Sequence, residues 1–270
     1  MEAYQDFAYV YDEFMDETPY EMWCERIHEL IGKYGVTEPT REAENILDSE
    51  KNLVVDLGCG TGTLTSALYQ KGYDMIGIDS SPSMLEIAMN KREEKGQEVL
   101  YLLQDMRELE LYSTVGTIIS VCDCINYVLE EEELQQVFSL VNNYLYPQGI
   151  FIFDFNTVYK YRDVIGDTTI AENRDDCSFI WENYYEEETG INQYDVTIFV
   201  REEEEMFKRF TETHFQRGYT PEQIMKLLGE AGMLLVEMRD ADTDGEVTPE
   251  TERVLVVARE QGKEVCIEEN

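Results

Sequence analysis

Residues 56–62, Asp-Leu-Gly-Cys-Gly-Thr-Gly, combine one carboxylate with three glycines at alternate positions. Glycine lets the backbone come close to a ligand, so a glycine-rich turn that follows a strand is typical of a cofactor-binding loop. The spacing here is GxGxG, whereas the dinucleotide fingerprint GxGxxG places a pyrophosphate at the N-terminus of a helix. The loop therefore favours a cofactor other than a nicotinamide or flavin dinucleotide.

Further acidic side chains follow the next two apolar runs of the chain. Asp79 ends the second run, where a carboxylate can accept hydrogen bonds from both hydroxyls of a ribose. Asp105 follows the third run beside Met106, where the acid can accept from an adenine amino group and the methionine can lie against the ring. Asp56 either holds the glycine loop through backbone amides or meets an amino group of the cofactor. Together these residues predict a nucleoside bound across successive strand ends.

The positions of these residues depend on an alternation of strands and helices. Apolar runs with the length of buried strands lie at 53–57, 75–78, 99–103, 115–121 and 150–155. Helical patterns separate them at 64–71, 83–95 and 131–146, and a capped helix at 220–231 precedes two more strands near 234–238 and 253–259. Such a βαβ series predicts a parallel sheet with helices packed on it.

Two segments do not fit that series. Residues 1–50 carry two apolar stripes at helical spacing, which predict two helices before the sheet. Residues 168–217 hold β-rich stretches on both sides of a turn at 187–190, which predict an antiparallel insertion.

Composition limits the possible partners and surroundings. The chain has 21 Lys and Arg against 58 Asp and Glu, a net charge of −37, which repels phosphate backbones and anionic membrane surfaces. Nucleic acid is therefore an unfavourable substrate, and no apolar window approaches the roughly 18 residues of a membrane span. The N-terminus has no signal-peptide pattern, so we expect a cytoplasmic protein with six reduced cysteines. With two histidines and no paired CxxC spacing, no metal site is predicted, although acidic residues could hold magnesium.

Four segments resemble the ordered motifs of class I S-adenosylmethionine (SAM)-dependent methyltransferases: VVDLGCGTG (54–62), GIDSSPSML (77–85), LLQDMREL (102–109) and LLGEAGM (227–233). The resemblance covers residues 50–260. The opening YQDFAYVYDEFM with PYEMW is similar to small bacterial methyltransferase-domain proteins in which an N-terminal helical cap folds over the cofactor.

The resemblance implies an α/β, Rossmann-like fold whose seven-stranded sheet is mostly parallel, with the last strand antiparallel. Residues 1–50 would form the cap, 51–167 and 218–262 the SAM-binding domain, and 168–217 an antiparallel β insertion acting as a substrate lid. The implied cofactor is SAM, with S-adenosylhomocysteine (SAH) as product. The implied cofactor-binding residues are Tyr11, Asp56, Gly58, Cys59, Gly60, Asp79, Ser80, Met84, Asp105, Met106 and Cys122.

A sulfonium is already an activated methyl donor, so alignment with a nucleophile supplies much of the catalysis. A hydroxyl or ammonium acceptor would also need a base, for which Asp123, Tyr127 and His214 are candidates. His214 either points at the acceptor or satisfies a surface hydrogen bond. Polar side chains after the fourth and fifth strands are expected at the acceptor, and from them we assign Asn126, Tyr127 and Asn156 to acceptor binding, while Asp154 is a further candidate base.

We therefore predict methyl transfer to an N, O or C nucleophile of a small molecule by a monomer or homodimer. One alternative is a tRNA-modifying methyltransferase, against which the missing basic patch counts. Another is a module that binds SAM without turnover.

Overall fold

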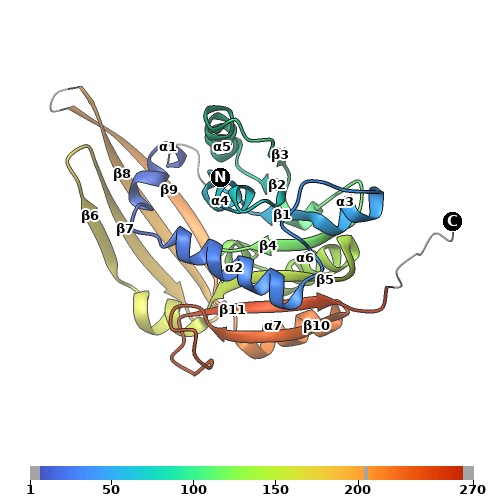
Figure 1. Ribbon diagram of the computed structural model, residues 1–270. Helices are drawn as coiled ribbons and strands as arrows, with labels where there is room; N and C mark the ends of the chain where they lie inside the picture. The colour runs from blue at the N-terminus through green and yellow to red at the C-terminus, as the bar shows by residue number, and fades with distance from the viewer. Residues whose placement is uncertain (1–6, 204–205, 264–270) are drawn as a thin grey trace.

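The computed structural model describes residues 7–203 and 206–263, and its larger sheet has seven strands in the order β10-β11-β5-β4-β1-β2-β3 (Figure 1). Strand β11 runs opposite to the other six strands of this sheet, which confirms the predicted, mostly parallel Rossmann-like sheet. The strands are β1 (Leu53–Leu57), β2 (Asp74–Asp79), β3 (Leu100–Leu103), β4 (Val115–Ser120), β5 (Leu145–Asn156), β10 (Met233–Asp240) and β11 (Arg253–Glu260).

Helices cover both faces of this sheet because alternate strand residues point to opposite sides. Val54 and Ile119 pack with α2 (Tyr20–Tyr34) and α4 (Thr63–Gln70), whereas Val55 and Ile118 pack with α6 (Glu131–Tyr144) and α7 (Pro221–Glu230). The remaining helices are α1 (Ala8–Phe14), α3 (Ile46–Asn52), α5 (Pro82–Lys95) and the short η1 (Met106–Glu108), η2 (Cys124–Tyr127) and η3 (Lys160–Ile165). Within the described ranges, no helix is long and apolar enough to cross a membrane.

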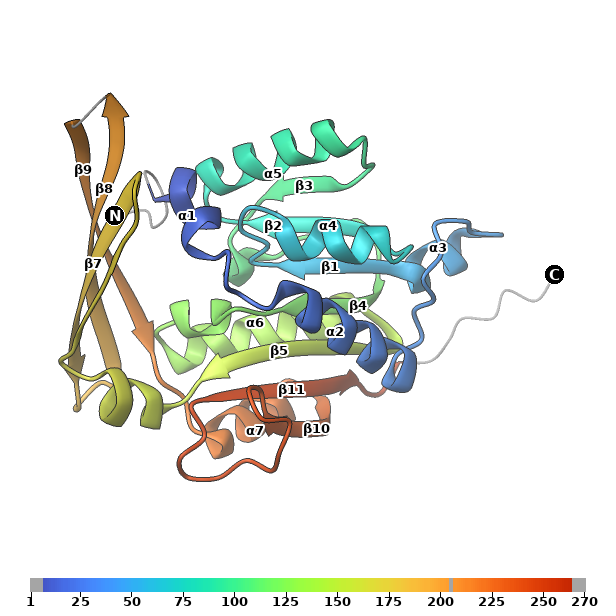
Figure 2. The ribbon, with the colours of Figure 1, turned by 60° about the vertical axis from the view of Figure 1, so that its left-hand side comes forward.

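The expected antiparallel insertion is a second sheet of four strands. Its order is β6 (Thr169–Asn173), β7 (Cys177–Glu186), β8 (Ile191–Glu203) and β9 (Met206–Arg217), and the predicted turn at 187–190 joins β7 to β8. Figure 2 shows this sheet standing across the carboxyl ends of the parallel strands, with α1 between it and α5. The insertion and α1 therefore face the edge where the predicted site residues gather.

Two element boundaries differ from our expectation. The helix predicted at 131–146 ends at Tyr144, because Pro147 disfavours helical backbone in the preceding residue and Leu145 instead pairs with Val115 of β4. A third helix, α3, precedes the sheet, where we expected two. Its N-cap is Asn45, whose side chain accepts from the amide of Asp48 at 3.0 Å, and its first residues are exposed, so it has no apolar stripe to reveal it.

Asn126 joins the main sheet to the insertion. Its Nδ2 donates to the carbonyls of Asn156 and Arg217 at 2.9 and 2.7 Å, and its Oδ1 accepts from the amide of Asn156 at 2.8 Å. We expected this residue to bind the acceptor, but its side chain is fully buried and both its amide nitrogen and its amide oxygen are hydrogen-bonded to backbone groups. Asn126 therefore holds η2 against the ends of β5 and β9.

Replacing this amide should weaken the fold. We expect Asn126→Ala to lower the free energy of unfolding by about 2 to 4 kcal/mol, because three buried backbone groups lose their partner. Chemical denaturation measures the change, with Asn143→Ala, at an exposed position of α6, as the control. A loss no larger than that of the control would contradict this structural role.

Candidate active site

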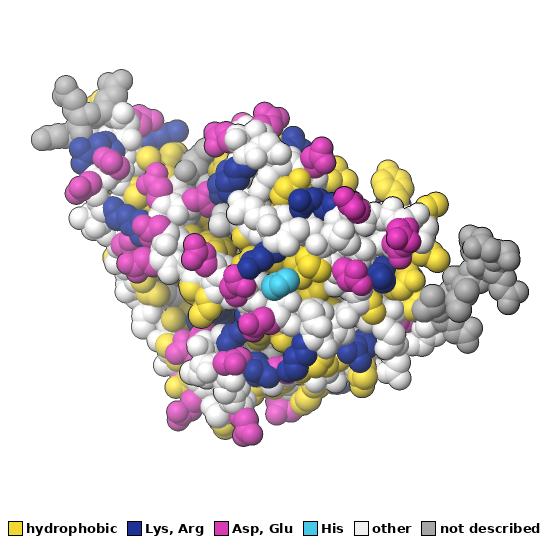
Figure 3. All heavy atoms as spheres, in the orientation of Figure 1, with side chains coloured by type: hydrophobic (Ala, Val, Ile, Leu, Met, Phe, Trp, Pro, Cys, Tyr) yellow, Lys and Arg dark blue, Asp and Glu magenta, His cyan; other side chains and the backbone are white. Residues whose placement is uncertain are grey.

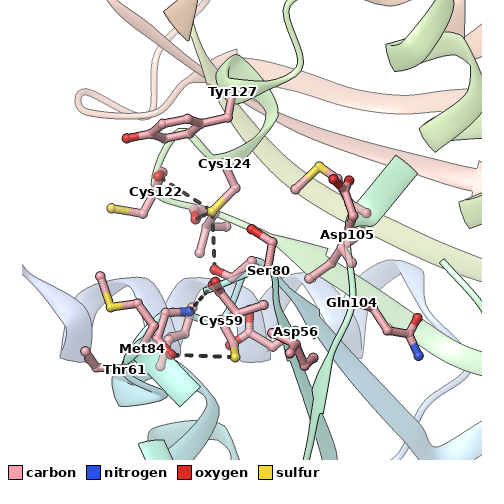
Figure 4. A pocket seen from close by; sticks show the side chains of 18 of the residues that line it. Asp56, Cys59, Thr61, Ser80, Met84, Gln104, Asp105, Cys122, Cys124 and Tyr127 are labelled. Carbon is pink, nitrogen blue, oxygen red and sulfur yellow. Dashed lines mark hydrogen bonds between the residues drawn. The ribbon is translucent and has the colours of Figure 1, made fainter. Parts of the chain in front are cut away.

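A cavity of about 750 Å³ lies where β1, β2, β3 and β4 end. The loops after these strands form its floor, and the N-terminal helices add Tyr11 from α1 and Tyr20 from α2. All the residues that we assigned to cofactor binding line this cavity, and Figure 4 shows side chains from several loops converging on it. The sheet edge thus brings together residues that are far apart in sequence.

The glycine loop has the backbone that its sequence predicts. Gly58, Gly60 and Gly62 have φ values of +85°, +54° and +73°, a region that favours glycine. The amides of Gly58 and Cys59 both donate to the carbonyl of Ile78, at 2.7 and 2.9 Å, which ties the loop to β2. A Cβ at Gly58 would lie 2.6 Å from the Cys124 Sγ, so only glycine fits there.

Asp79 links the same loop to the cavity. Its Oδ2 accepts from the amide of Gly60 and its Oδ1 from the amide of Ser81, each at 2.8 Å. Burial raises the pKa of Asp79, while these backbone N–H groups act in the opposite direction. Each carboxylate oxygen has a second lone pair, so Asp79 can hold the loop and still accept from a diol.

Asp56 lies under the loop and is 2% exposed. Its Oδ2 accepts from the Thr65 hydroxyl of α4 at 2.5 Å, a side-chain partner and not a loop amide. Burial raises the pKa of Asp56 to about 7, and the hydrogen bond from Thr65 opposes that rise. This carboxyl is therefore a titratable group in the floor of the cavity.

The acid after β3 has a partner that we did not expect. Asp105 Oδ1 accepts from the Arg107 amide at 2.9 Å and from its Nε at 3.0 Å, and Arg107 also pairs with Glu133. The Arg107 guanidinium lowers the pKa of Asp105. Asp105 is thus a charged acceptor beside Met106 at one end of the cavity.

The loop after β4 has an unusual backbone. Cys122 and Asp123 are consecutive non-glycine residues with φ of 67° and 54°, and such strained residues persist where their surroundings impose them. Here both amides donate to the buried Asp154 carboxylate, at 3.2 and 2.8 Å, and Arg253 lies 3.6 Å from the same group. Asp154 therefore fixes the direction in which Cys122 faces the cavity.

The same geometry turns Asp123 away from the cavity. Its carboxylate accepts from Gln216 of β9, and Asp123 is not among the residues that line the cavity. Asn156 also lies outside the lining: its buried amide contacts the Tyr161 hydroxyl at 3.0 Å and the Lys160 Nζ at 3.1 Å. Asp123, an expected base, and Asn156, an expected acceptor ligand, therefore stabilise the contact between the main sheet and the segment that carries the insertion.

Tyr127 and His214, two of the candidate bases, meet although they are 87 residues apart. Tyr127 lines the cavity, and its hydroxyl lies 2.7 Å from the Tyr194 hydroxyl and 3.2 Å from His214 Nδ1. His214 is 2% exposed, which excludes a surface hydrogen bond as its role, and its Nε2 lies 3.3 Å from Glu212 Oε2. The insertion thus places a histidine and a carboxylate behind a cavity tyrosine.

Helix α1 closes the space between the glycine loop and the insertion. On one side Asp12 accepts from the Thr61 hydroxyl at 2.6 Å and pairs with Lys91 at 2.5 Å. On the other side Asp16 pairs with Arg174 at 2.9 Å, and Phe14 packs edge-on against Phe179 of β7 with ring centroids 4.9 Å apart. Tyr11 from the same helix reaches the cavity, 3.9 Å from the Cys122 Sγ.

Several lining or supporting residues were missed from the sequence. Glu212 could have been predicted from the sequence, because it precedes His214 by two residues in one strand and so lies on the same face of that strand. Tyr20 and Cys124 had no such signal, since their positions depend on how separate elements dock.

Comparison with known proteins agrees with the geometry of the cavity. Residues 54–149 match the family model described as a methyltransferase domain. Two proteins named "Putative methyltransferase" are each 32% identical to this chain over 95% of its length: one from Geobacillus sp. (strain WCH70), covered to 99%, and YqeM from Bacillus subtilis (strain 168), covered to 96%.

Solved structures give the same result. A SAM-dependent methyltransferase from Clostridium acetobutylicum ATCC 824 superposes with a TM-score of 0.83 at 29% identity, over 97% of this chain and 100% of that one. The SAM-bound amino pentose methyltransferase CalS10 from Micromonospora echinaspora has a TM-score of 0.70 at 14% identity, over 97% and 99% of the two chains, and shares the fold.

The raised pKa of Asp56 should make cofactor binding depend on pH. Between roughly pH 5.5 and 7 we expect the affinity for SAH to rise about tenfold, because the carboxyl is mostly neutral below about 7 and only its ionised form attracts an ammonium group. Isothermal titration of SAH at several pH values measures this rise.

Asp56→Asn, which is neutral throughout, should show a much flatter pH dependence than the wild type. Asp175→Asn, in an exposed turn between β6 and β7, is the matched control and should titrate as the wild type does. An unchanged pH dependence in Asp56→Asn would assign the effect to another group.

Proposed function

This chain belongs to the class I SAM-dependent methyltransferases, and we propose that it methylates a small molecule whose nucleophile is held beside Tyr127. The observation that carries the acceptor class is the position of α1 and the β insertion over the strand ends where the cavity lies, with Tyr11 of α1 lining the cavity itself. Figure 2 shows both elements standing over the strand ends.

The donor sets around the cavity fit SAM in one order. Asp105 and Met106 would receive the adenine, and Asp79 the ribose hydroxyls. Asp56 and the glycine loop would receive the methionine part, and in that order Cys122 and Tyr127 would lie on the side of the sulfonium. When bound, SAM supplies an activated methyl group, so the main task of the protein is to align the acceptor and exclude water.

The closure by α1 favours a small acceptor. The ion pairs of Asp12 with Lys91 and of Asp16 with Arg174 anchor this helix on both sides of the cavity. A folded RNA would have to displace it to reach the Tyr127 end. A small metabolite would need only a local opening, which costs less ordered structure.

Charge counts in the same direction. The net charge of −37 opposes a polyanionic acceptor. On the face drawn in Figure 3, basic side chains lie singly or in small groups among acidic ones and do not form a continuous stripe. RNA recognition typically uses such a stripe.

A labelling experiment distinguishes the acceptor classes. Purified full-length protein would be incubated with methyl-labelled SAM and, in parallel, with a low-molecular-weight cell extract, total tRNA and a protein fraction. We expect label in the small-molecule fraction only, and none with Asp79→Ala, which should lose the cofactor. Label that enters tRNA and is released by ribonuclease would contradict the proposal.

A further inference from the structure

We propose that the acceptor is an amine, bound as its ammonium form, and that Tyr127 removes its proton with His214 and Glu212 behind it. This inference rests on the function proposed above and adds the acceptor's chemical class and the path of the proton. Four observations support it: the position of Tyr127, the orientation of His214, the surrounding charges and the aromatic rings.

Tyr127 connects the cavity with the insertion. In Figure 4 its ring lies above Cys122 and Cys124, at the end of the cavity away from Gln104 and Asp105. Its hydroxyl is within hydrogen-bond distance of His214 Nδ1, at 3.2 Å, and of the Tyr194 hydroxyl, at 2.7 Å. A tyrosine placed in this way can take a proton from a group in the cavity and pass its own to the imidazole.

The negative charge of Glu212 favours the tautomer of His214 that this transfer needs, although the two side chains are in contact without a hydrogen bond between them. The Glu212 Oε2 lies 3.3 Å from Nε2, and its Oε1 accepts from the amide of Phe7 at 2.9 Å, which fixes the carboxylate. A carboxylate so close favours a proton on Nε2, and the lone pair of Nδ1 then faces the Tyr127 hydroxyl. The Tyr194 ring stacks on the imidazole at 5.0 Å and 10°, which restricts its rotation.

The groups around this network suit a cation. Glu212 comes from β9, and Asp123 lies behind Gln216, near Tyr161. The nearby cations are already engaged in the described structure, because Lys160 donates to Asn156 and Arg253 pairs with Asp154 and Asp242. Glu212 and Asp123 lie behind the cavity wall, and their negative charge opposes a carboxylate or phosphate acceptor. Lys160 and Arg253 are committed to the partners named above.

Aromatic rings that line the cavity strengthen the same preference. Tyr11, Tyr20 and Tyr127 are among its lining residues. Aromatic faces attract ammonium groups, most strongly where water is excluded. The acid strength of the acceptor also favours an amine. An alkylammonium and a tyrosine phenol are acids of similar strength, so a proton can pass between them, whereas an alcohol is a far weaker acid.

The proposed step is balanced in protons and electrons. The ammonium N–H proton passes to the Tyr127 oxygen as the Tyr127 proton passes to His214 Nδ1, giving an imidazolium beside the Glu212 carboxylate. The freed nitrogen lone pair then forms the bond to the methyl carbon. The carbon–sulfur bond breaks, and its electron pair remains on sulfur as a neutral thioether. The imidazolium later releases its proton to solvent.

The first test compares acceptor classes under one set of conditions. Full-length protein and methyl-labelled SAM would be incubated with primary alkylamines and with the alcohols and carboxylates of the same carbon skeletons, across a range of pH. We expect label in amines alone, with kcat rising with pH as the network loses its proton. Transfer to alcohols or carboxylates, or to none of the three series while SAM still binds, would overturn this inference but not the proposed function.

The second test assigns the residues. Tyr127→Phe should lower kcat for the best amine about 10²- to 10⁴-fold with little change in the KM for SAM. His214→Gln should remove the rise of kcat with pH, and Glu212→Gln should weaken it. His28→Gln, which loses only a contact with Tyr73, and Tyr184→Phe, at an exposed position of β7, are the matched controls and should behave as wild type.

Two measurements keep the result clear if a variant is unstable. Each variant is first titrated with SAH, and a variant that still binds SAH is folded. If the wild-type protein does not bind SAH, that result contradicts the proposed function and not only this inference. In wild type, ¹⁵N spectra of the two histidines, assigned with His28→Gln, should show His214 protonated on Nε2. A proton on Nδ1 in its neutral form would overturn the role given to Glu212.

Discussion

Carboxylates that accept hydrogen bonds from backbone amides hold the irregular loops at the edge of the sheet. Asp79 accepts from the loops after β1 and β2, and Asp154 accepts from two successive amides of the loop after β4. A loop in left-handed conformation points several amide N–H groups to one side, where one carboxylate can accept from all of them. The hydrogen bonds offset the free-energy cost of removing the carboxylate from water. Without these two contacts the cavity would have neither its floor nor the orientation of Cys122 and Tyr127.

The insertion and α1 complete the site from outside the core fold. Phe14, Arg174 and Glu212 connect α1 with the insertion, while Asp12 connects it with the glycine loop. The helix therefore contacts both the side on which we propose the cofactor and the side on which we propose the acceptor. A movement of α1 that admits a ligand would also disturb the hydrogen bond from Phe7 that fixes Glu212, so ligand binding and the proposed proton transfer would share one element.

The parts of this structure that depend on local sequence could be predicted. The glycine loop, the acids after β2 and β3 and the alternation of strands and helices are local patterns, and the residues that we assigned from them to the cofactor line one cavity. Asn126 and Asn156, which we assigned to the acceptor, are buried and contact backbone groups or a neighbouring side chain, a role that a polar residue after a strand can equally take. The meeting of Tyr127 with His214 was beyond prediction, since it depends on how the insertion docks on the sheet.

The structure of the protein crystallised with SAH tests the central claim most directly. The account predicts adenine at Asp105 and Met106, ribose hydroxyls on Asp79, and the sulfur on the side of Cys122 and Tyr127. SAH bound in the opposite direction, or with its sulfur remote from Tyr127, would contradict the assignment of this cavity as the site of methyl transfer.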